Sequence, residues 1–245
     1  MFNVLVFDVY GEFGYFRVPY TTKSTLTYSF PPPPAIKGML GAMLGLSRNE
    51  YLKVLSDAHI GIRIKSSVKT MKMGVNIINT KGANGKFDNT LIASRKSSPS
   101  ARTQVFVEVL KRPAYRIYVK LQDALHAKLK RHLENHETYY SISLGVSEFL
   151  ADFKYAGEFE AVELDASTVV HSVIPEDCIL RLAIKDMDLK IWKEQVHVRM
   201  EQDRTVTLFQ DVVFALEDSP LTGEFKSNDT GRLYRINDEV IYLWG

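Results

Sequence analysis

Two histidines with a spacing known from zinc sites are the first candidates for chemistry. His132 and His136 lie four residues apart, with Glu134 and Glu137 beside them, and side chains on successive turns of a helix can share a zinc ion. The sequence lacks a His-Glu-x-x-His pattern and a third ligand. It also lacks a carboxylate cluster such as two-metal nucleases use. We therefore expect neither a metal nor another cofactor.

Metal-independent RNA cleavage would need a general acid and a general base, which His, Tyr and Lys side chains can provide. These residue types are present, but the sequence does not show which of them come together. The other histidines lie in predicted strands or helices without a nucleophile motif beside them: His59, His126, His171 and His197. Cleavage of RNA is therefore only the alternative to a role in binding RNA, and we predict no catalytic residue.

Lys37 and Gly38 begin a glycine-rich helical segment and could hold an anion. The start of a helix offers backbone donors and a favourable dipole, and Lys37 adds a cation. The segment is not a P-loop, because the Gly-x-x-x-x-Gly-Lys-Ser/Thr spacing is absent. The alternative is that Gly38, Gly41 and Gly45 serve only close helix packing. Both interpretations stay open.

One segment of the chain is strongly basic, although the whole chain is nearly neutral with 31 Lys and Arg against 29 Asp and Glu. Between residues 63 and 102 the only acid is Asp88. Nine cations in such a span favour contact with a polyanion over simple solvation. The nine are Arg63, Lys65, Lys69, Lys72, Lys81, Lys86, Arg95, Lys96 and Arg102.

Two predicted strand faces carry aromatic and basic side chains that could stack on and neutralise single-stranded RNA. One face holds Phe13, Tyr15 and Arg17, and the other holds Arg116, Tyr118 and Lys120. The alternative is that these side chains serve solubility and cross-strand pairing. Arg17, Arg116 and Tyr118 join the predicted RNA-binding residues, together with Lys37, Gly38 and the nine cations.

The order of the elements predicts how these residues are positioned. A buried strand at residues 3–9 is followed by Pro31–Pro34, a helix through Leu44 and a strand at residues 60–65. After the basic insertion come two strands, a helix and further strands. This order predicts an α+β fold with a ferredoxin-like, RRM-like core. We expect one domain at residues 1–155, with an insertion at about 66–104, and a β-rich C-terminal region at 156–245.

Composition indicates the cellular setting. The single cysteine, Cys178, excludes an internal disulfide and suits a reducing compartment. The first apolar run is interrupted by Asp8, and no stretch approaches the roughly 20 apolar residues of a spanning helix. We expect a cytoplasmic protein without membrane contact.

The segment from Tyr28 to Gly45, with four prolines before the glycine-rich helix, resembles the N-terminal motif of CRISPR-associated protein family five, within the RAMP superfamily. The resemblance continues at residues 16–19, 103–110, 115–119 and 140–145, and covers about the first 155 residues. It implies a ferredoxin-like palm in which the basic insertion forms a hairpin thumb.

The resemblance also implies a function. Members of this family are subunits of type I Cascade complexes in antiviral defence, and this chain is most similar to those of type I-B. The implied role is a non-catalytic ribonucleoprotein subunit that grips the 5′ handle of the guide RNA, contacts the backbone and large subunits, and meets target DNA only indirectly.

Two alternatives to this role remain. The type I-C branch of the family cuts precursor RNA with a Tyr, Lys and His set, which has no mapped counterpart in this sequence. The second alternative is a protein-interaction scaffold that presents Pro31–Pro34 as a polyproline ligand.

Overall fold

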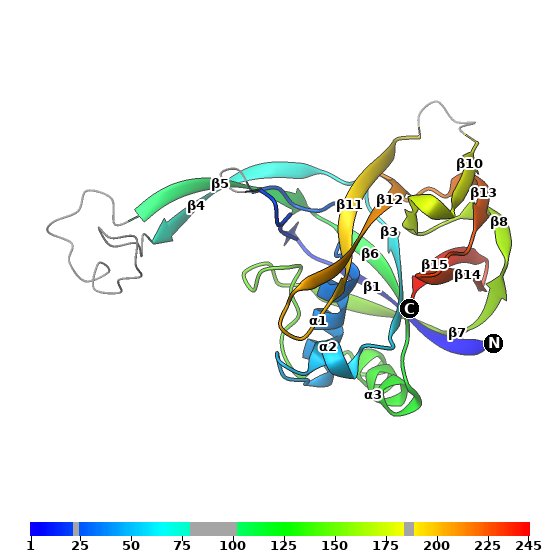
Figure 1. Ribbon diagram of the computed structural model, residues 1–245. Coiled ribbons are helices and arrows are strands. Elements are labelled where there is room, and N and C mark those ends of the chain that lie inside the picture. The colour runs from blue at the N-terminus through cyan, green and yellow to red at the C-terminus, as the bar shows by residue number, and fades with distance from the viewer. Residues whose placement is uncertain (22–24, 79–101, 184–188) are drawn as a thin grey trace, which may run out of the picture.

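The computed structural model describes residues 1–21, 25–78, 102–183 and 189–245. Six antiparallel strands form a closed barrel in the order β1-β6-β3-β15-β14-β7 (Figure 1). Their bounds are β1 Phe2–Tyr10, β3 His59–Ile64, β6 Ala114–Lys120, β7 Asp152–Leu164, β14 Gly231–Ile236 and β15 Glu239–Trp244.

Three small sheets and three α-helices complete the described part of the chain. No described helix is both long and apolar enough to cross a membrane. The sheets are β10-β13-β8 (Ile179–Leu182, Leu221–Lys226, Ala166–Val170), β11-β12-β9 (Ile191–Met200, Val206–Ala215, Ile174–Pro175) and β2-β5-β4 (Phe13–Gly14, Arg102–Lys111, Thr70–Ile78). The helices are α1 Pro33–Leu44, α2 Tyr51–Val54 and α3 Asp123–Glu134.

The barrel strands β1, β3, β6 and β15 are largely buried on both faces, whereas β7 has one exposed face. Inside, Val4, Val6, Tyr118 and Leu243 belong to one small apolar cluster. Gly61 leaves no room for a side chain, because a Cβ atom there would lie only 2.5 Å from Cδ2 of Leu243. On the outer face, alternate residues of the same strands join a larger core with α1, α3 and the β11–β12 pair.

A charged network occupies one end of this barrel. Glu239 on β15 accepts from Arg63 of β3 at 2.5 Å and from the Tyr118 hydroxyl of β6. Arg116 of β6 forms a bidentate pair with Asp8 of β1 at 2.7 and 3.0 Å and lies 3.5 Å from Glu239. Burial, followed by the Glu239 charge, raises the pKa of Tyr118 well above its usual range. The network therefore ties β1, β3, β6 and β15 together.

The predicted α+β, ferredoxin-like (RRM-like) palm is wrong. The described part of the chain is mostly β-structure, with three α-helices, and its central sheet is a closed barrel. The cause is the pairing of β14 with β7 and of β15 with β3, which brings C-terminal strands into the N-terminal sheet. The expected domain boundary near residue 155 falls within β7 and stays a prediction.

A long hairpin occupies the position of the expected insertion. β4 and β5 pair antiparallel from Thr70 opposite Leu110 to Ile78 opposite Arg102. Figure 1 shows the pair projecting away from the barrel and helices. Residues 79–101, which connect the two strands, lie outside the described residues.

The proline-rich segment and α1 follow local rules. Pro33 and Pro34 take the first helical positions, where a missing N–H costs little. The helix ends at Gly45, whose φ of 73° is left-handed and whose N–H donates to the Ala42 carbonyl. Pro31–Pro34 are all buried, so the alternative of an exposed polyproline ligand is wrong.

The segment before α1 is anchored by a partly buried carboxylate. The Ser29 N–H donates to Glu194 of β11 at 3.1 Å, and the buried Tyr115 hydroxyl donates to the Ser29 carbonyl at 2.9 Å. Burial raises the pKa of the Glu194 carboxyl to about 7. This anchor holds the start of α1 against β11.

The glycines of α1 differ in the space around them, which gives a matched pair of substitutions. A Cβ at Gly41 would lie 2.8 Å from Cβ of Tyr51, whereas one at Gly38 would meet only ordinary contacts at 3.7 Å. We expect Gly41→Ala to destabilise the fold by about 1 to 3 kcal/mol because α2 must move. Gly38→Ala should be neutral or stabilise by about 0.5 to 1 kcal/mol. Urea unfolding measures both, and equal effects would contradict the packing role of Gly41.

Removal of one charge should show how much the barrel depends on Glu239. Glu239→Gln leaves Arg63 and Arg116 partly buried beside a neutral partner, and we expect a loss of about 2 to 4 kcal/mol in the free energy of unfolding. Glu160→Gln, at an exposed position of β7, is the control and should change stability by less than about 0.5 kcal/mol. Denaturation with urea measures both variants. If Glu239→Gln lowers the free energy of unfolding by less than about 1 kcal/mol, Glu239 does not hold the barrel closed.

Candidate nucleic-acid interface

Four of the predicted RNA-binding residues lie in or beside the charged network. Arg63, Arg116 and Tyr118 bind the acidic side chains described above. Lys65 donates to Asp218 at 2.5 Å, and Arg63 donates to the same carboxylate at 2.7 Å. These cations already have carboxylate partners, and Tyr118 is buried. The four side chains therefore make contacts within the fold and do not form an open surface.

The cations on and beside the β4–β5 hairpin differ from these four residues in their exposure to solvent. Lys69, Lys72 and Arg102 are exposed, and none of them forms an ion pair with a carboxylate of the described residues. The cross-strand neighbour of Lys72 is Glu108, so this charge is partly balanced. The hairpin thus offers a mainly positive surface to solvent.

An aromatic side chain accompanies these cations. The strand register places Phe106 opposite Gly74, two positions from the Lys72–Glu108 pair and on the same face. Its side chain is 58% exposed, and a base can stack on such a ring. Phe106 was missed in the sequence, although Gln104 and Glu108 on the same face of its strand indicated that this face is exposed.

Lys81, Lys86, Arg95 and Lys96 lie outside the described residues, and their RNA-binding role stays a prediction. Arg17 is exposed, and its guanidinium donates to the Thr21 carbonyl at 3.4 Å. The face expected from Phe13 to Arg17 is not one regular strand, because β2 covers only Phe13–Gly14 and Phe13 packs against Phe149.

Lys37 and Gly38, although adjacent on α1, lie in different surroundings. Gly38 lies beside the ring of Tyr51, but a Cβ there would meet only ordinary contacts at 3.7 Å, so close packing does not require this glycine. The backbone donors expected at the start of α1 are already used, because Pro33 and Pro34 have none and the N–H groups of Ala35 and Ile36 donate to the Pro32 carbonyl. An anion here would have to be held by side chains.

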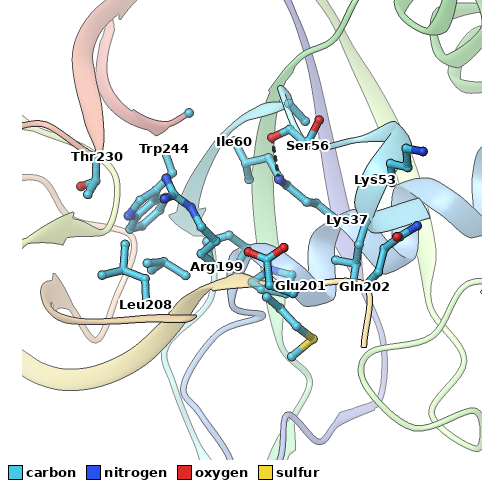
Figure 2. Close-up of a pocket in the computed structure, with 17 residues that line it drawn as sticks. Lys37, Lys53, Ser56, Ile60, Arg199, Glu201, Gln202, Leu208, Thr230 and Trp244 are labelled. Atoms are coloured by element: carbon cyan, nitrogen blue, oxygen red, sulfur yellow. Dashed lines mark hydrogen bonds between the residues drawn. The ribbon is translucent and has the colours of Figure 1, made fainter. Parts of the chain in front are cut away.

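Lys37 lies in a cleft of about 400 Å³ between α1, α2 and the β11–β12 pair. Its ammonium donates to the Ser56 carbonyl at 3.0 Å (Figure 2). Burial, followed by the charge of Arg199, lowers the pKa of Lys37. Arg199 and Trp244 also line the cleft. The sequence could not place them there, because they belong to strands far from Lys37 in the chain.

The histidine pair considered for zinc does not form a site. α3 ends at Glu134, so His132 is helical whereas His136 follows the helix with a φ of 54°. His136 pairs instead with Asp152 at 3.0 Å and stacks on Phe153. Among the described residues, no cluster of three or more His, Cys, Asp or Glu side chains could hold a metal.

Comparisons with known proteins show what the sequence and the fold of this chain are similar to. A family model described as CRISPR-associated protein (Cas_Cas5) matches residues 4–216. No curated protein matches the chain. A chain of a solved CRISPR RNA-guided surveillance complex has a TM-score of 0.54 at 14% identity, over 89% of this chain and 91% of that one. A CRISPR protein from Archaeoglobus fulgidus has a TM-score of 0.54 at 14% identity, over the whole of both chains.

The two structural similarities show a shared fold, whereas the match to the family model is a similarity of sequence. Its match begins in β1 and extends to the end of β12, which confirms the resemblance carried by the proline and glycine segment. The chain belongs to the CRISPR-associated protein (Cas_Cas5) family.

Proposed function

We propose that this chain is a non-catalytic subunit of a type I CRISPR RNA-guided complex and that it binds the 5′ handle of the guide RNA through the β4–β5 hairpin. In this proposal it also contacts the backbone and large subunits of the complex. The observation that carries the proposal is the contrast between Lys69, Lys72 and Arg102, which are exposed, and Arg63, Lys65 and Arg116, which are partly buried and paired with carboxylates.

Two further observations support it. Family membership places the chain among CRISPR-associated proteins, and one protein with this fold is a chain of an RNA-guided surveillance complex. The hairpin projects from the barrel (Figure 1), so an RNA strand could cross it without meeting the network around Glu239. Exposed cations and an exposed ring are the groups that bind a single strand.

Charge reversal on the hairpin tests the RNA-binding part. We expect Lys69→Glu with Lys72→Glu to weaken binding to RNA that carries the 5′ handle at least tenfold at about 0.1 M salt. The slope of log K against log salt should become shallower by about 1.4, since each lost contact with single-stranded RNA contributes about 0.7. Titrations at several salt concentrations measure both quantities.

The matched control reverses two exposed lysines elsewhere, Lys154 on β7 and Lys226 on β13. It has the same net charge as the hairpin variant, so a general electrostatic effect would weaken both variants equally. Equal weakening, or unchanged binding by the hairpin variant, would contradict the proposed role of the hairpin.

Incubation with labelled repeat RNA in EDTA tests the non-catalytic part. We expect the RNA to stay intact, since His126 and His171 each make a ring-nitrogen contact within the fold, with Glu158 and with the Val240 N–H. Heat-unfolded protein is the control for contaminating nuclease. Site-specific cleavage by the folded protein alone would identify an endoribonuclease instead.

A further inference from the structure

We propose that the cleft between α1, α2 and the β11–β12 pair is a second binding site, which takes a phosphate group together with the nucleoside attached to it. The site is separate from the hairpin, and the proposal does not rest on the hairpin's role. The ligand could be one nucleotide of an RNA strand or a free mononucleotide, since both present the same chemistry.

The charges of the cleft favour an anion. Lys37, Lys53 and Arg199 line it, and Glu201 is the only carboxylate side chain among the lining residues. No ion pair joins Lys37 or Arg199 to a described carboxylate, and the Lys37 ammonium has a neutral carbonyl as its partner. Lys37 and Arg199 face one space and repel each other, and a bound phosphate would reduce that repulsion.

The geometry places these cations on separate elements around the same space. Lys37 comes from α1 and Lys53 from α2, whereas Arg199 comes from the end of β11 (Figure 2). Glu201 and Gln202 follow Arg199 at the turn toward β12. The β11–β12 turn is fixed against the helices, because Gln202 donates to the Asn49 carbonyl and Arg204 to the Arg48 carbonyl. Lys37 and Arg199 therefore face the cleft from separate elements, whereas the Lys53 side chain points away from the space between them (Figure 2).

The rest of the wall suits a flat, largely apolar group. Pro33, Pro34, Leu52, Ile60, Leu208 and Trp244 line it. The Trp244 N–H donates to Gln210 at 2.9 Å, so the carbon surface of the indole is what the cleft can offer. A volume of about 400 Å³ lies within the range of small-molecule pockets. Glu201 could accept a hydrogen bond from a ribose hydroxyl or a base amine.

Trp244 provides a direct readout. The chain has two tryptophans, and Trp192 is 52% exposed on β11. In a Trp192→Phe background the fluorescence of Trp244 alone reports the cleft. We expect AMP and a short single-stranded RNA to change this fluorescence saturably, and adenosine to bind at least tenfold more weakly than AMP because it lacks the phosphate.

Substitutions in the same background locate the binding. Arg199→Gln should weaken AMP binding about tenfold, the effect of one lost charged hydrogen bond, and Lys37→Gln should do the same. Arg235→Gln is the matched control, since Arg235 is an exposed arginine of β14 outside the cleft lining. It should leave AMP binding within twofold of the parent. Melting temperatures show whether each variant is folded.

Each outcome bears on the proposal. Saturable binding that Arg199→Gln weakens and Arg235→Gln spares supports it, and the stronger ligand of AMP and RNA identifies the source. The proposal is overturned if neither ligand changes the Trp244 signal, if adenosine equals AMP, if inorganic phosphate equals AMP, or if both arginine variants behave alike. Failure of the hairpin variant to lose RNA binding would leave this result untouched, so the two proposals can fail separately.

Discussion

The ion pairs of Glu239 are the interactions on which the rest of this structure depends. β15 shares only one register pair with β3, between Trp244 and Ile60. At the other end of the strand, Glu239 binds Arg63 of β3 and Tyr118 of β6. The seam of the barrel is thus held by a backbone pair at one end and by a partly buried carboxylate at the other. A barrel without open edges needs such a seam.

Both proposed binding surfaces depend on how β3 is held in this seam. The start of the strand carries Ile60, which lines the cleft beside Trp244. Its end carries Arg63, and a few residues later the chain enters β4 through Lys69. A shift of β3 by one residue would turn Arg63 out of the barrel and change the direction of the hairpin. The same pairing therefore positions an anion-binding cleft and a projecting cationic hairpin.

Local signals in the sequence were sufficient for α1 and for several strands. Prolines at the helix start and Gly45 at its end act within a few residues, so the helix was predicted correctly. The barrel was not, because its closure depends on pairs such as Arg63 with Glu239, which are 176 residues apart. Hydrophobic periodicity shows that a strand has two different faces, but it does not show that a closed barrel buries both.

Contacts between distant residues also explain why the sequence did not show which candidate site residues are exposed. Arg116 and Tyr118 alternate with apolar residues, a pattern typical of an exposed basic face, yet that face lines the end of the barrel. Lys69 and Lys72 show an equally basic pattern and are exposed. The difference lies in carboxylates supplied by distant parts of the chain, above all Asp218 in the loop after β12 and Glu239 on β15. Lys37 was recognised from its helix, but Arg199 and Trp244 belong to the cleft only through the tertiary fold.

The hairpin and the cleft use the same charges under different physical conditions. Cations on the projecting hairpin face water, so their attraction for phosphate is long-ranged but strongly weakened by salt. Lys37 is partly desolvated, and salt screens such a charge much less. In the proposed function, attraction by the hairpin gathers an RNA strand from solution but fixes no register. In the proposed second site, a cleft with cations and a shaped apolar wall takes one nucleotide in one place, so it would set the position that the hairpin leaves undetermined.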